Sequence, residues 1–292
     1  MADEKAPEMT DLNNALIKAC RNGDIKEVEN FISNGADVNF KNEDGITPLY
    51  MAIIIGHADL AEMLISNGAI VNGKNNKGKS YLDRAIINGN DKIVEMLISK
   101  GVNVNDKDKD GVTPLFIASM EGNKKIVDTL ISNGANVNDK DNIQRSPLYM
   151  ASKNGHLKVA ETLISNGANV NDKDNIYTSP LYIASMNGRI EIVKLLLSQG
   201  ANVDKNIIFA ARNEKIADIL QSWPRSMAIL ALQEKNAFNH LGMNELTDLD
   251  EYMGKQGPHY GGKRRNKKSK RFIKRKSNNN KKKRKTLRKR RR

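Results

Sequence analysis

The sequence predicts an all-α solenoid, a row of stacked helix-turn-helix repeats, and two observations carry this prediction. The first is a period of 33 residues: Gly122 has glycine equivalents at positions 56, 89, 155 and 188. The second is the phrase Thr-Pro-Leu at 113–115, which recurs at 47–49 and, as Ser-Pro-Leu, at 146–148 and 179–181. A fixed period of this size indicates units that stack on their neighbours and share one continuous core.

The unit at 108–140 illustrates how one repeat is built. Thr113 is suited to cap a helix through its hydroxyl, and Pro114 suits the first helical position. Gly122 ends this short helix, because glycine adopts the left-handed backbone favoured at helix ends. A second helix follows with apolar residues on one face, and Gly134 ends it. Two helices of this size cannot bury their apolar faces alone, so the unit needs neighbours.

The repeated residues resemble the ankyrin-repeat family. The resemblance rests on Thr-Pro-Leu, an alanine three residues later, the mid-repeat glycine and a closing Gly-Ala-Asn-Val-Asn, as at 134–138. It extends over residues 10–222, most of the chain. It implies an ankyrin-repeat solenoid in which short hairpin turns join the helix pairs.

The chain is expected to have four parts. Residues 1–9 are predicted to be a flexible N-terminus and 10–222 the repeat domain. Residues 223–253 are predicted to form a short helical extension that seals the end of the solenoid or docks elsewhere, and 254–292 a disordered tail. The repeat domain is expected to contain an N-terminal capping repeat with helices over 12–20 and 25–32, five full repeats at 42–74, 75–107, 108–140, 141–173 and 174–205, and a shortened C-terminal cap over 207–220.

Two departures from the repeat pattern lead to specific expectations. The repeat at 75–107 has Ser80-Tyr81-Leu82 in place of Thr-Pro-Leu, so we expect its first helix to start less sharply. Gln144 and Tyr177 stand where other repeats have the turn glycine. Because a non-glycine residue is strained in a left-handed turn, we expect these two turns to adopt another geometry.

The charge of the chain is divided between an acidic body and a basic tail. Of 48 Lys and Arg residues, 21 follow residue 253, and no Asp or Glu accompanies them. The first 253 residues therefore carry 27 basic and 34 acidic residues, a net charge of −7. The two parts need separate explanations.

The remaining composition favours an intracellular protein. The single cysteine, Cys20, cannot form an internal disulfide and replaces an Ala or Ser of later repeats, so a buried packing role is expected. The first residues lack the apolar core of a secretory signal. The most apolar run, 52–65, contains charged residues and is too short to span a bilayer, so no membrane association is expected.

Residues 73–80, Gly-Lys-Asn-Asn-Lys-Gly-Lys-Ser, match the phosphate-binding P-loop pattern. A P-loop also needs a preceding strand in a parallel sheet, and none is predicted here. The repeat pattern already accounts for these residues, because Gly78 is the turn glycine and Ser80 replaces the capping Thr. Nucleotide binding is kept only as a remote alternative.

Other chemical motifs are weaker still. Asp106, Asp108 and Asp110 imitate the start of a calcium-binding EF-hand loop, but Ile117 occupies the place of its closing Glu. His57 and His156 follow mid-repeat glycines and are expected to be structural. With no nucleophile–base–acid constellation, we expect no enzymatic activity, no metal site and no cofactor.

The family resemblance implies a concave protein-binding face made of hairpin tips and first helices. Exposed Ile and Met residues on these helices would be hard to explain as a solvated surface, and packing between repeats is the alternative. The expected tip residues are Glu43, Asp44, Ile46, Asn76, Lys77, Lys79, Lys109, Asp110, Asn142, Arg145, Asn175 and Ile176. The expected helix residues are Ile54, Ile55, Ile87, Asn88, Met120, Glu121, Lys153, Asn154, Met186 and Asn187.

The basic tail is typical of nuclear import signals and of nucleic-acid contacts. Its aromatic residues are few, so attraction to phosphates is expected to dominate over base stacking. The clusters comprise Lys263, Arg264, Arg265, Lys267, Lys268, Lys270, Arg271, Lys281, Lys282, Lys283, Arg284, Lys285, Arg288, Lys289, Arg290, Arg291 and Arg292.

The leading hypothesis is a protein-interaction scaffold whose tail directs it to the nucleus through an import receptor, or to nucleic acid. The alternatives are a nucleic-acid-binding protein that acts through the tail and P-loop nucleotide binding at 73–80. The expected location is the nucleus, with the cytoplasm as the alternative. The repeats, the Trp-Pro at 223–224 and the basic tail together resemble ankyrin proteins of large DNA viruses that infect amoebae or algae. This resemblance implies a host protein as partner.

Overall fold

The computed structural model describes residues 5–76, 78–203 and 205–223. They belong to one compact unit that extends from Met1 to Ser226. The described residues form helices and turns, apart from one isolated antiparallel bridge between Lys74 and Ser80, so the all-α prediction is confirmed. The predicted helices over 226–253 and the disordered tail over 254–292 lie outside the described residues.

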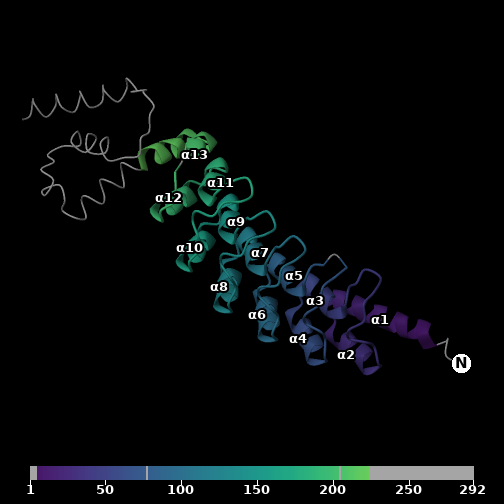
Figure 1. Ribbon diagram of the computed structural model, residues 1–292. Helices are drawn as coiled ribbons and strands as arrows, with labels where there is room; N and C mark the ends of the chain where they lie inside the picture. The colour runs from purple at the N-terminus through teal and green to yellow at the C-terminus, as the bar shows by residue number, and fades with distance from the viewer. Residues whose placement is uncertain (1–4, 77, 204, 224–292) are drawn as a thin grey trace, which may run out of the picture. The chain divides into compact units, whose positions relative to one another are not determined.

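The helices follow one another in pairs along a solenoid (Figure 1). Residues 214–223 are also helical and follow α13 as a shorter final pair. The bounds are α1 Lys5–Asn22, α2 Ile25–Ser33, α3 Pro48–Ile55, α4 Ala58–Ser66, α5 Tyr81–Ile87, α6 Asp91–Ser99, α7 Pro114–Glu121, α8 Lys124–Ser132, α9 Pro147–Asn154, α10 Leu157–Ser165, α11 Pro180–Met186, α12 Ile190–Ser198 and α13 Lys205–Ala210.

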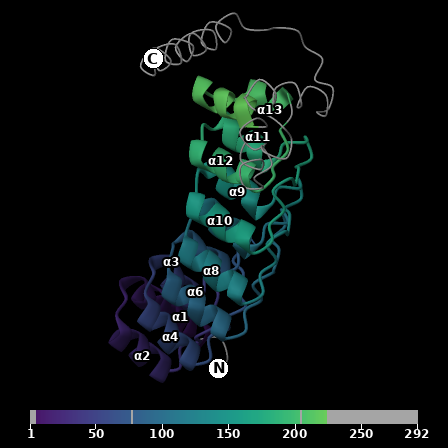
Figure 2. The same ribbon diagram turned by 90° about the vertical axis from the view of Figure 1, so that its left-hand side faces the viewer.

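The pairs stack so that first helices contact first helices and second helices contact second helices. The helices α3, α5, α7, α9 and α11 form one layer, which we call the inner layer (Figures 1 and 2). The helices α4, α6, α8, α10 and α12 form the outer layer beside it. Hairpin turns connect each outer helix to the next inner helix, and they project from one side of the row (Figure 1).

The predicted helix starts and stops are present. At α7 the Thr113 hydroxyl accepts a hydrogen bond from the Phe116 amide at 3.2 Å, and proline occupies the first turn. Gly122 ends this helix with a left-handed φ of 81°. The same cap is formed by Thr47 at α3, Ser146 at α9 and Ser179 at α11. Each cap satisfies an amide that would otherwise have no partner at the helix end.

The core runs continuously through the repeats. The Leu of every Thr-Pro-Leu equivalent is buried, from Leu49 to Leu181, and so is at least one Leu on each outer helix from α4 to α12. Burial of one such side chain contributes roughly 1.5–3 kcal/mol. Cys20 lies in this core, fully buried, as predicted. Burial raises the pKa of its thiol to about 12.

The expectation of a less sharp start for the repeat at 75–107 is wrong. The Ser80 hydroxyl accepts from the Asp83 amide at 3.0 Å, and the Asp83 carboxylate accepts from the Ser80 amide at 3.1 Å. This reciprocal capping box satisfies two amides instead of one. Tyr81, in the place of proline, stacks on the Tyr50 ring at 5.1 Å and shares a 2.7 Å hydrogen bond with the Thr47 hydroxyl.

The first helix is longer than predicted at both ends. The sequence indicated a helix over 12–20 after a flexible segment, whereas α1 begins at Lys5 and ends at Asn22. Pro7 is tolerated because it lies in the first turn, where an amide hydrogen has no helical partner. Ala6, Glu8 and Met9 are good helix formers, and this accounts for the extension.

An asparagine clamp joins consecutive repeats on the outer side. The Asn105 side chain donates to the Gly134 carbonyl at 2.9 Å and accepts from the Asn136 amide at 3.0 Å. Both groups belong to the loop that follows the next outer helix, so one side chain links two repeats. The same pair of bonds is made by Asn39, Asn138 and Asn171.

The clamp is missing at one joint. Among the described residues, Asn72 makes neither of the two bonds to the repeat at 75–107, although it occupies the same position. Gly73 follows it and donates no turn bond, and a side chain at Gly73 would meet the Tyr81 ring. Tyr81 in turn donates its amide to the Gly73 carbonyl at 3.1 Å. The missing clamp therefore coincides with Tyr81 in the place of proline, whose amide and ring both contact Gly73.

Candidate protein-binding surface

Each hairpin tip is held by one Asn or Asp side chain at its base. The Asp141 carboxylate accepts from the amides of Ile143 at 3.1 Å and Arg145 at 2.8 Å. Asp174 accepts in the same way from Ile176 at 3.1 Å and Thr178 at 2.7 Å. Asn42 and Asp108 repeat this arrangement. The tips are therefore ordered turns whose amides are already satisfied.

The expectation that Gln144 and Tyr177 change the turn geometry is wrong. Their φ angles are 66° and 63°, close to the 73° to 77° of the glycines at the other tips. The Asp at the base fixes the turn through its two amide bonds, so the backbone stays left-handed. An L-residue in this conformation costs roughly 1–2 kcal/mol relative to the right-handed one. These two tips thus carry strain that the glycine tips avoid.

Several predicted contact residues instead join one tip to the preceding tip. The bonds are short and repeat at successive tips, so they stiffen the row. They join the Asn76 side chain to the Glu43 carbonyl (3.1 Å), the Asn142 amide to the Asp110 carbonyl (3.0 Å), the Asn142 side chain to the Lys109 carbonyl (3.0 Å) and the Asn175 amide to the Ile143 carbonyl (3.1 Å). Asn76, Asn142 and Asn175 are therefore partly structural.

Two predicted cations are paired within the row. Lys79 forms an ion pair with Asp108 at 2.7 Å, and its hydrogen bond to that carboxylate raises the pKa of Lys79. Burial would raise the pKa of Asp108, but Lys79 and the amides of Val112 and Asp110 outweigh burial and lower it. Arg145 pairs with Asp141 at 2.6 Å and lies 5.6 Å above the ring centre of Phe116.

The inner helices expose apolar side chains where the family pattern predicted them. Ile55, Ile87 and Met186 are exposed at 46%, 40% and 46%, and each lies at the C-terminal end of its helix. Ile54 and Met120 are partly buried and pack against the core, so they follow the alternative of packing between repeats. Three of the five apolar positions therefore face solvent.

The asparagines among these positions mostly bind backbone. Asn88 donates to the Ile53 and Ile54 carbonyls at 3.1 and 2.8 Å, and Asn154 donates to the Met120 carbonyl at 2.7 Å. The bonds of Asn88 and Asn154 cross from one inner helix to the previous one. Asn187 bonds within its own helix to the Ile183 carbonyl at 2.8 Å.

A groove of about 720 Å³ lies beside the ends of α3 and α5. Ile54 and Ile55 form one wall and Asn88 another, and Lys92 and Lys125 border it. Lys125 is held by Asp91 at 3.4 Å and Glu95 at 3.1 Å. The lining of this groove is mostly polar, with Ile54 and Ile55 as its large apolar side chains.

The other predicted positions vary in exposure. Glu43, Asp44, Lys109, Asp110 and Glu121 are exposed, whereas Ile46 and Lys153 are half-buried. Ile176 is the most exposed of the predicted apolar residues, at 79%. Lys77 and the Lys and Arg clusters of the tail lie outside the described residues.

Sequence reasoning missed three exposed apolar residues near the C-terminal end of the solenoid. Ile143 is exposed at 49%, Tyr177 at 81% and Phe209 at 87%. Tyr177 could have been found from its place in the glycine position, because a left-handed tip directs any side chain there outward. Phe209 lies in α13, where the repeat pattern is too shortened to assign a face.

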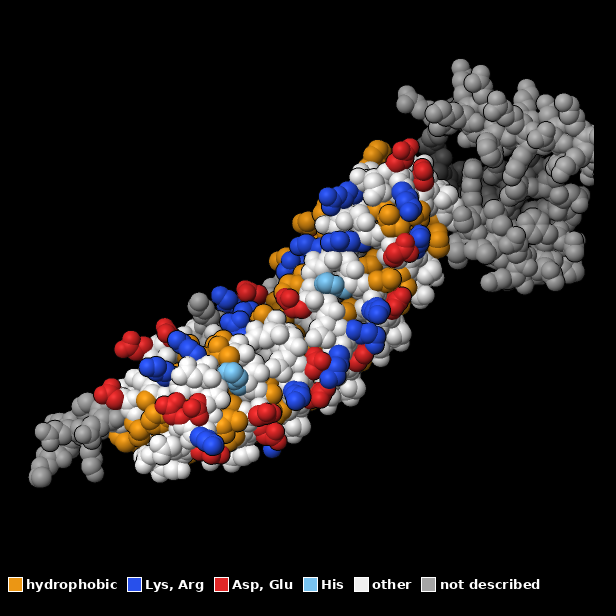
Figure 3. Space-filling view, turned by 180° about the vertical axis from the view of Figure 1, so that it is seen from behind, with side chains coloured by type: hydrophobic (Ala, Val, Ile, Leu, Met, Phe, Trp, Pro, Cys, Tyr) orange, Lys and Arg blue, Asp and Glu red, His pale blue; other side chains and the backbone are white. Residues whose placement is uncertain are grey.

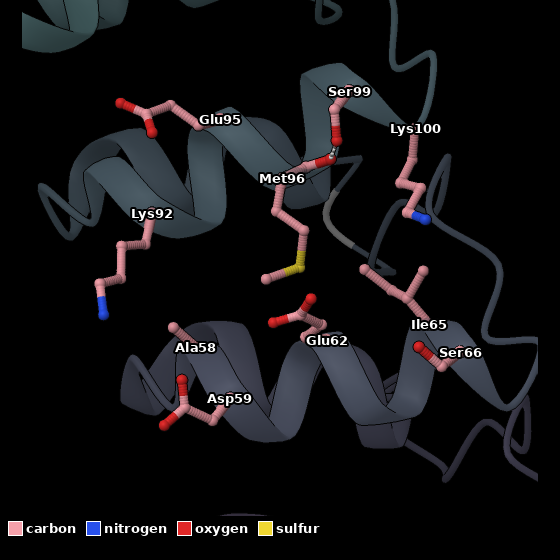
Figure 4. Close-up of a pocket in the computed structure, with 10 residues that line it drawn as sticks. All are labelled: Ala58, Asp59, Glu62, Ile65, Ser66, Lys92, Glu95, Met96, Ser99 and Lys100. Atoms are coloured by element: carbon pink, nitrogen blue, oxygen red, sulfur yellow. Dashed lines mark hydrogen bonds between the residues drawn. The ribbon is translucent and has the colours of Figure 1, made fainter.

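A second groove, of about 590 Å³, separates the outer helices α4 and α6 (Figure 4). Met96 points from α6 toward Glu62 on α4, and charged side chains surround them (Figure 4). This groove lies at the joint without the asparagine clamp. The face shown in Figure 3 carries basic and acidic side chains interspersed along its lower edge, with apolar patches between them.

The P-loop letters at 73–80 form a hairpin turn in the structure. The Lys74–Ser80 bridge closes the turn, Lys79 is committed to Asp108, and Ser80 caps α5. The same Asp108 has both carboxylate oxygens occupied, one by two amides and one by Lys79, which disagrees with a calcium loop. His156 approaches the Met120 carbonyl at 2.9 Å, in keeping with a structural role.

No helix in the described part of the chain is long and apolar enough to cross a membrane. Among the same described residues, no group of three or more His, Cys, Asp or Glu side chains is arranged to hold a metal ion.

Comparison with known proteins gives one family and many similar folds. The family model described as "Ankyrin repeats (3 copies)" matches residues 16–108, 100–174 and 144–208. No curated protein matches the chain. The human ASB11 ankyrin repeat domain is similar with a TM-score of 0.65 and 24% identity, over 71% of this chain and 96% of that one. The ankyrin repeat domain of Bcl-3, a member of the IkappaB family, gives 0.62 and 25%, over 71% and 97%.

Proposed function

The chain belongs to the ankyrin-repeat family, and from this premise we propose that it is a non-enzymatic, intracellular scaffold that binds a partner protein. Ankyrin-repeat domains generally mediate protein–protein interaction. The proposed surface consists of the hairpin tips and the exposed ends of the inner helices. The resemblance to ankyrin proteins of large DNA viruses favours a host protein as this partner.

The observation that carries this proposal is the spacing of apolar side chains along the inner layer. Ile87 and Met186 occupy the same repeat position on α5 and α11, Ile55 lies one repeat position later on α3, and all three are exposed at the C-terminal ends of their helices. Exposed apolar side chains gathered along one face are a feature of interaction surfaces, because solvent exposure of each one is unfavourable. Capped tips and inter-tip bonds hold the surface in shape, so binding needs little reordering.

The test uses the full chain with Ile55→Ser, Ile87→Ser and Met186→Ser combined. Proteins captured from cell extract by the wild-type chain should be lost by this variant, with its thermal midpoint unchanged. The matched control is Ile25→Ser with Ile70→Ser, two isoleucines exposed at 37% and 61% outside the tips and inner helices. If the control loses the same proteins, or the triple variant keeps them, the inner layer is not the binding surface.

For the tail we propose nuclear targeting through an import receptor, with contact to nucleic acid as the second candidate. The supporting observation is composition: 21 Lys and Arg after residue 253 without one Asp or Glu. Binding to duplex DNA should not depend on the base sequence. The affinity should fall by about 0.9 decades per tenfold increase in salt concentration for each phosphate neutralised. A fusion lacking 254–292 should lose nuclear enrichment. Continued nuclear accumulation would rule out the targeting role.

A further inference from the structure

Four exposed apolar side chains gather where the row of tips ends. Ile176, Tyr177 and Phe209 line one groove of about 470 Å³ between the last tip and α13. Ile143 belongs to the preceding tip, which is joined to this one by the bond from the Asn175 amide to the Ile143 carbonyl. Their exposure ranges from 49% to 87%. No other stretch of the described surface combines so many exposed large apolar side chains.

The backbone at Tyr177 indicates that its side chain serves a purpose outside the fold. Equivalent tips at 45, 78 and 111 use glycine, which adopts the left-handed turn without strain. Tyr177 adopts the strained left-handed backbone, yet its ring is 81% exposed, so packing of the ring contributes little to the stability of the fold. A strained residue retained with an exposed side chain is the kind of observation from which a functional role is inferred.

The last tip of the row ends on a backbone carbonyl that accepts from none of the described residues. Each tip described above offers a carbonyl to the next one, as Ile143 does to Asn175 at 3.1 Å. Ile176 is the equivalent of Ile143 one repeat later, and no described residue donates to its carbonyl. The groove therefore presents a hydrogen-bond acceptor in the direction in which the next tip would have stacked.

The groove differs from the others in charge. The lining residues that the structure describes are apolar or neutral polar, whereas the α4–α6 groove is lined by Asp59, Glu62, Lys92, Glu95 and Lys100. A charged segment of the partner would lose its hydration in this groove and find no described opposite charge to compensate, so its burial would be unfavourable. An uncharged segment loses far less and gains contact with Tyr177 and Phe209.

We propose that this groove is the anchor point for the partner, a proposal that rests on the scaffold function above. It takes an extended, uncharged segment of the partner protein. One backbone amide of that segment donates to the Ile176 carbonyl, continuing the stacking of the tips. An aromatic or large aliphatic side chain of the segment lies between Tyr177 and Phe209, where aromatic contacts contribute most to interface affinity.

The test uses short random peptides displayed on phage and selected on the full-length chain. Enriched peptides should be uncharged around an aromatic or large aliphatic residue. Their affinity, measured by fluorescence anisotropy, should fall roughly tenfold or more with Phe209→Ser and with Tyr177→Gly, and stay unchanged with Ile70→Ser. Tyr177→Gly should not lower the thermal midpoint because it relieves strain, so lost binding there cannot reflect unfolding. Charged consensus peptides, or equal affinity for all variants, would overturn the proposal.

A photo-crosslinker identifies the occupant. Phe209→benzoylphenylalanine in the full chain should crosslink to the selected peptide. Crosslinking to a second copy, or to this chain's own C-terminal residues, in preference to the peptide would overturn the partner assignment. If Ile55→Ser, Ile87→Ser and Met186→Ser abolish capture of cell proteins while Tyr177→Gly does not, the scaffold function stands and the anchor point is wrong.

Discussion

The asparagine clamp provides a matched test of what holds neighbouring repeats together. Asn105→Ala removes the 2.9 Å bond to the Gly134 carbonyl and the 3.0 Å bond from the Asn136 amide. A net contribution of about 0.5–1.5 kcal/mol per hydrogen bond predicts a loss of about 1–3 kcal/mol in the free energy of unfolding. Asn72→Ala changes the same residue type at the same repeat position but removes no clamp, so its effect should stay within about 0.5 kcal/mol.

The assay is urea unfolding followed by far-ultraviolet circular dichroism, with both variants and the wild-type chain in one buffer. With a denaturant dependence of roughly 2 kcal/mol per molar, Asn105→Ala should lower the midpoint by about 0.5–1.5 M. Midpoints are compared because repeat arrays need not unfold in one step. Equal shifts for the two variants would show that the clamp does not stabilise the joint, and the reasoning from these bonds would fail.

Three further predictions follow from the described contacts. Ser80→Ala should destabilise the chain by about 1 kcal/mol, because it breaks the capping box of α5, and chemical denaturation measures this directly. Asp108 has a lowered pKa, so its contribution is present above the ordinary value of 3.8 and lost as pH falls below it; the gap between the urea midpoints of wild type and Asp108→Asn should therefore be wide at neutral pH and narrow at about pH 3. Cys20, with its pKa raised to about 12 by burial, should resist thiol reagents at about pH 8 in the native chain and react once urea unfolds it.

The repeat period and the cap residues made most of the fold predictable. Thr113 and Gly122 start and end α7 as expected, because capping chemistry acts over a few residues. Ser80 was misjudged because the comparison with Thr-Pro-Leu drew attention to the missing proline and away from Asp83, the second half of the capping box. Tyr177 was misjudged because the propensity of one residue was weighed without the Asp174 bonds that fix its turn.

The surface was less predictable than the core. The family pattern identified exposed positions such as Ile55 and Met186, but it could not distinguish them from Ile54, which packs inward. That difference depends on the rotation of each helix against its neighbours. The asparagines at the tips and helix ends also look like free polar groups in the sequence. Only three-dimensional stacking reveals that Asn88 and Asn142 bind the preceding repeat.

Because the clamp is absent at Asn72, the joints between repeats of the solenoid differ in stiffness. On the inner side this joint is firmly latched, by the Tyr50–Tyr81 stack, the Thr47 hydrogen bond and the Asn88 bonds. On the outer side it lacks the asparagine clamp that Asn39, Asn105, Asn138 and Asn171 make at four other joints, and the α4–α6 groove lies there. A bending load along the solenoid would therefore open this joint first, with the outer layer separating and the inner layer staying in contact. Elastic compliance would be concentrated between residues 74 and 75, and the repeats on either side would move as two stiff arms.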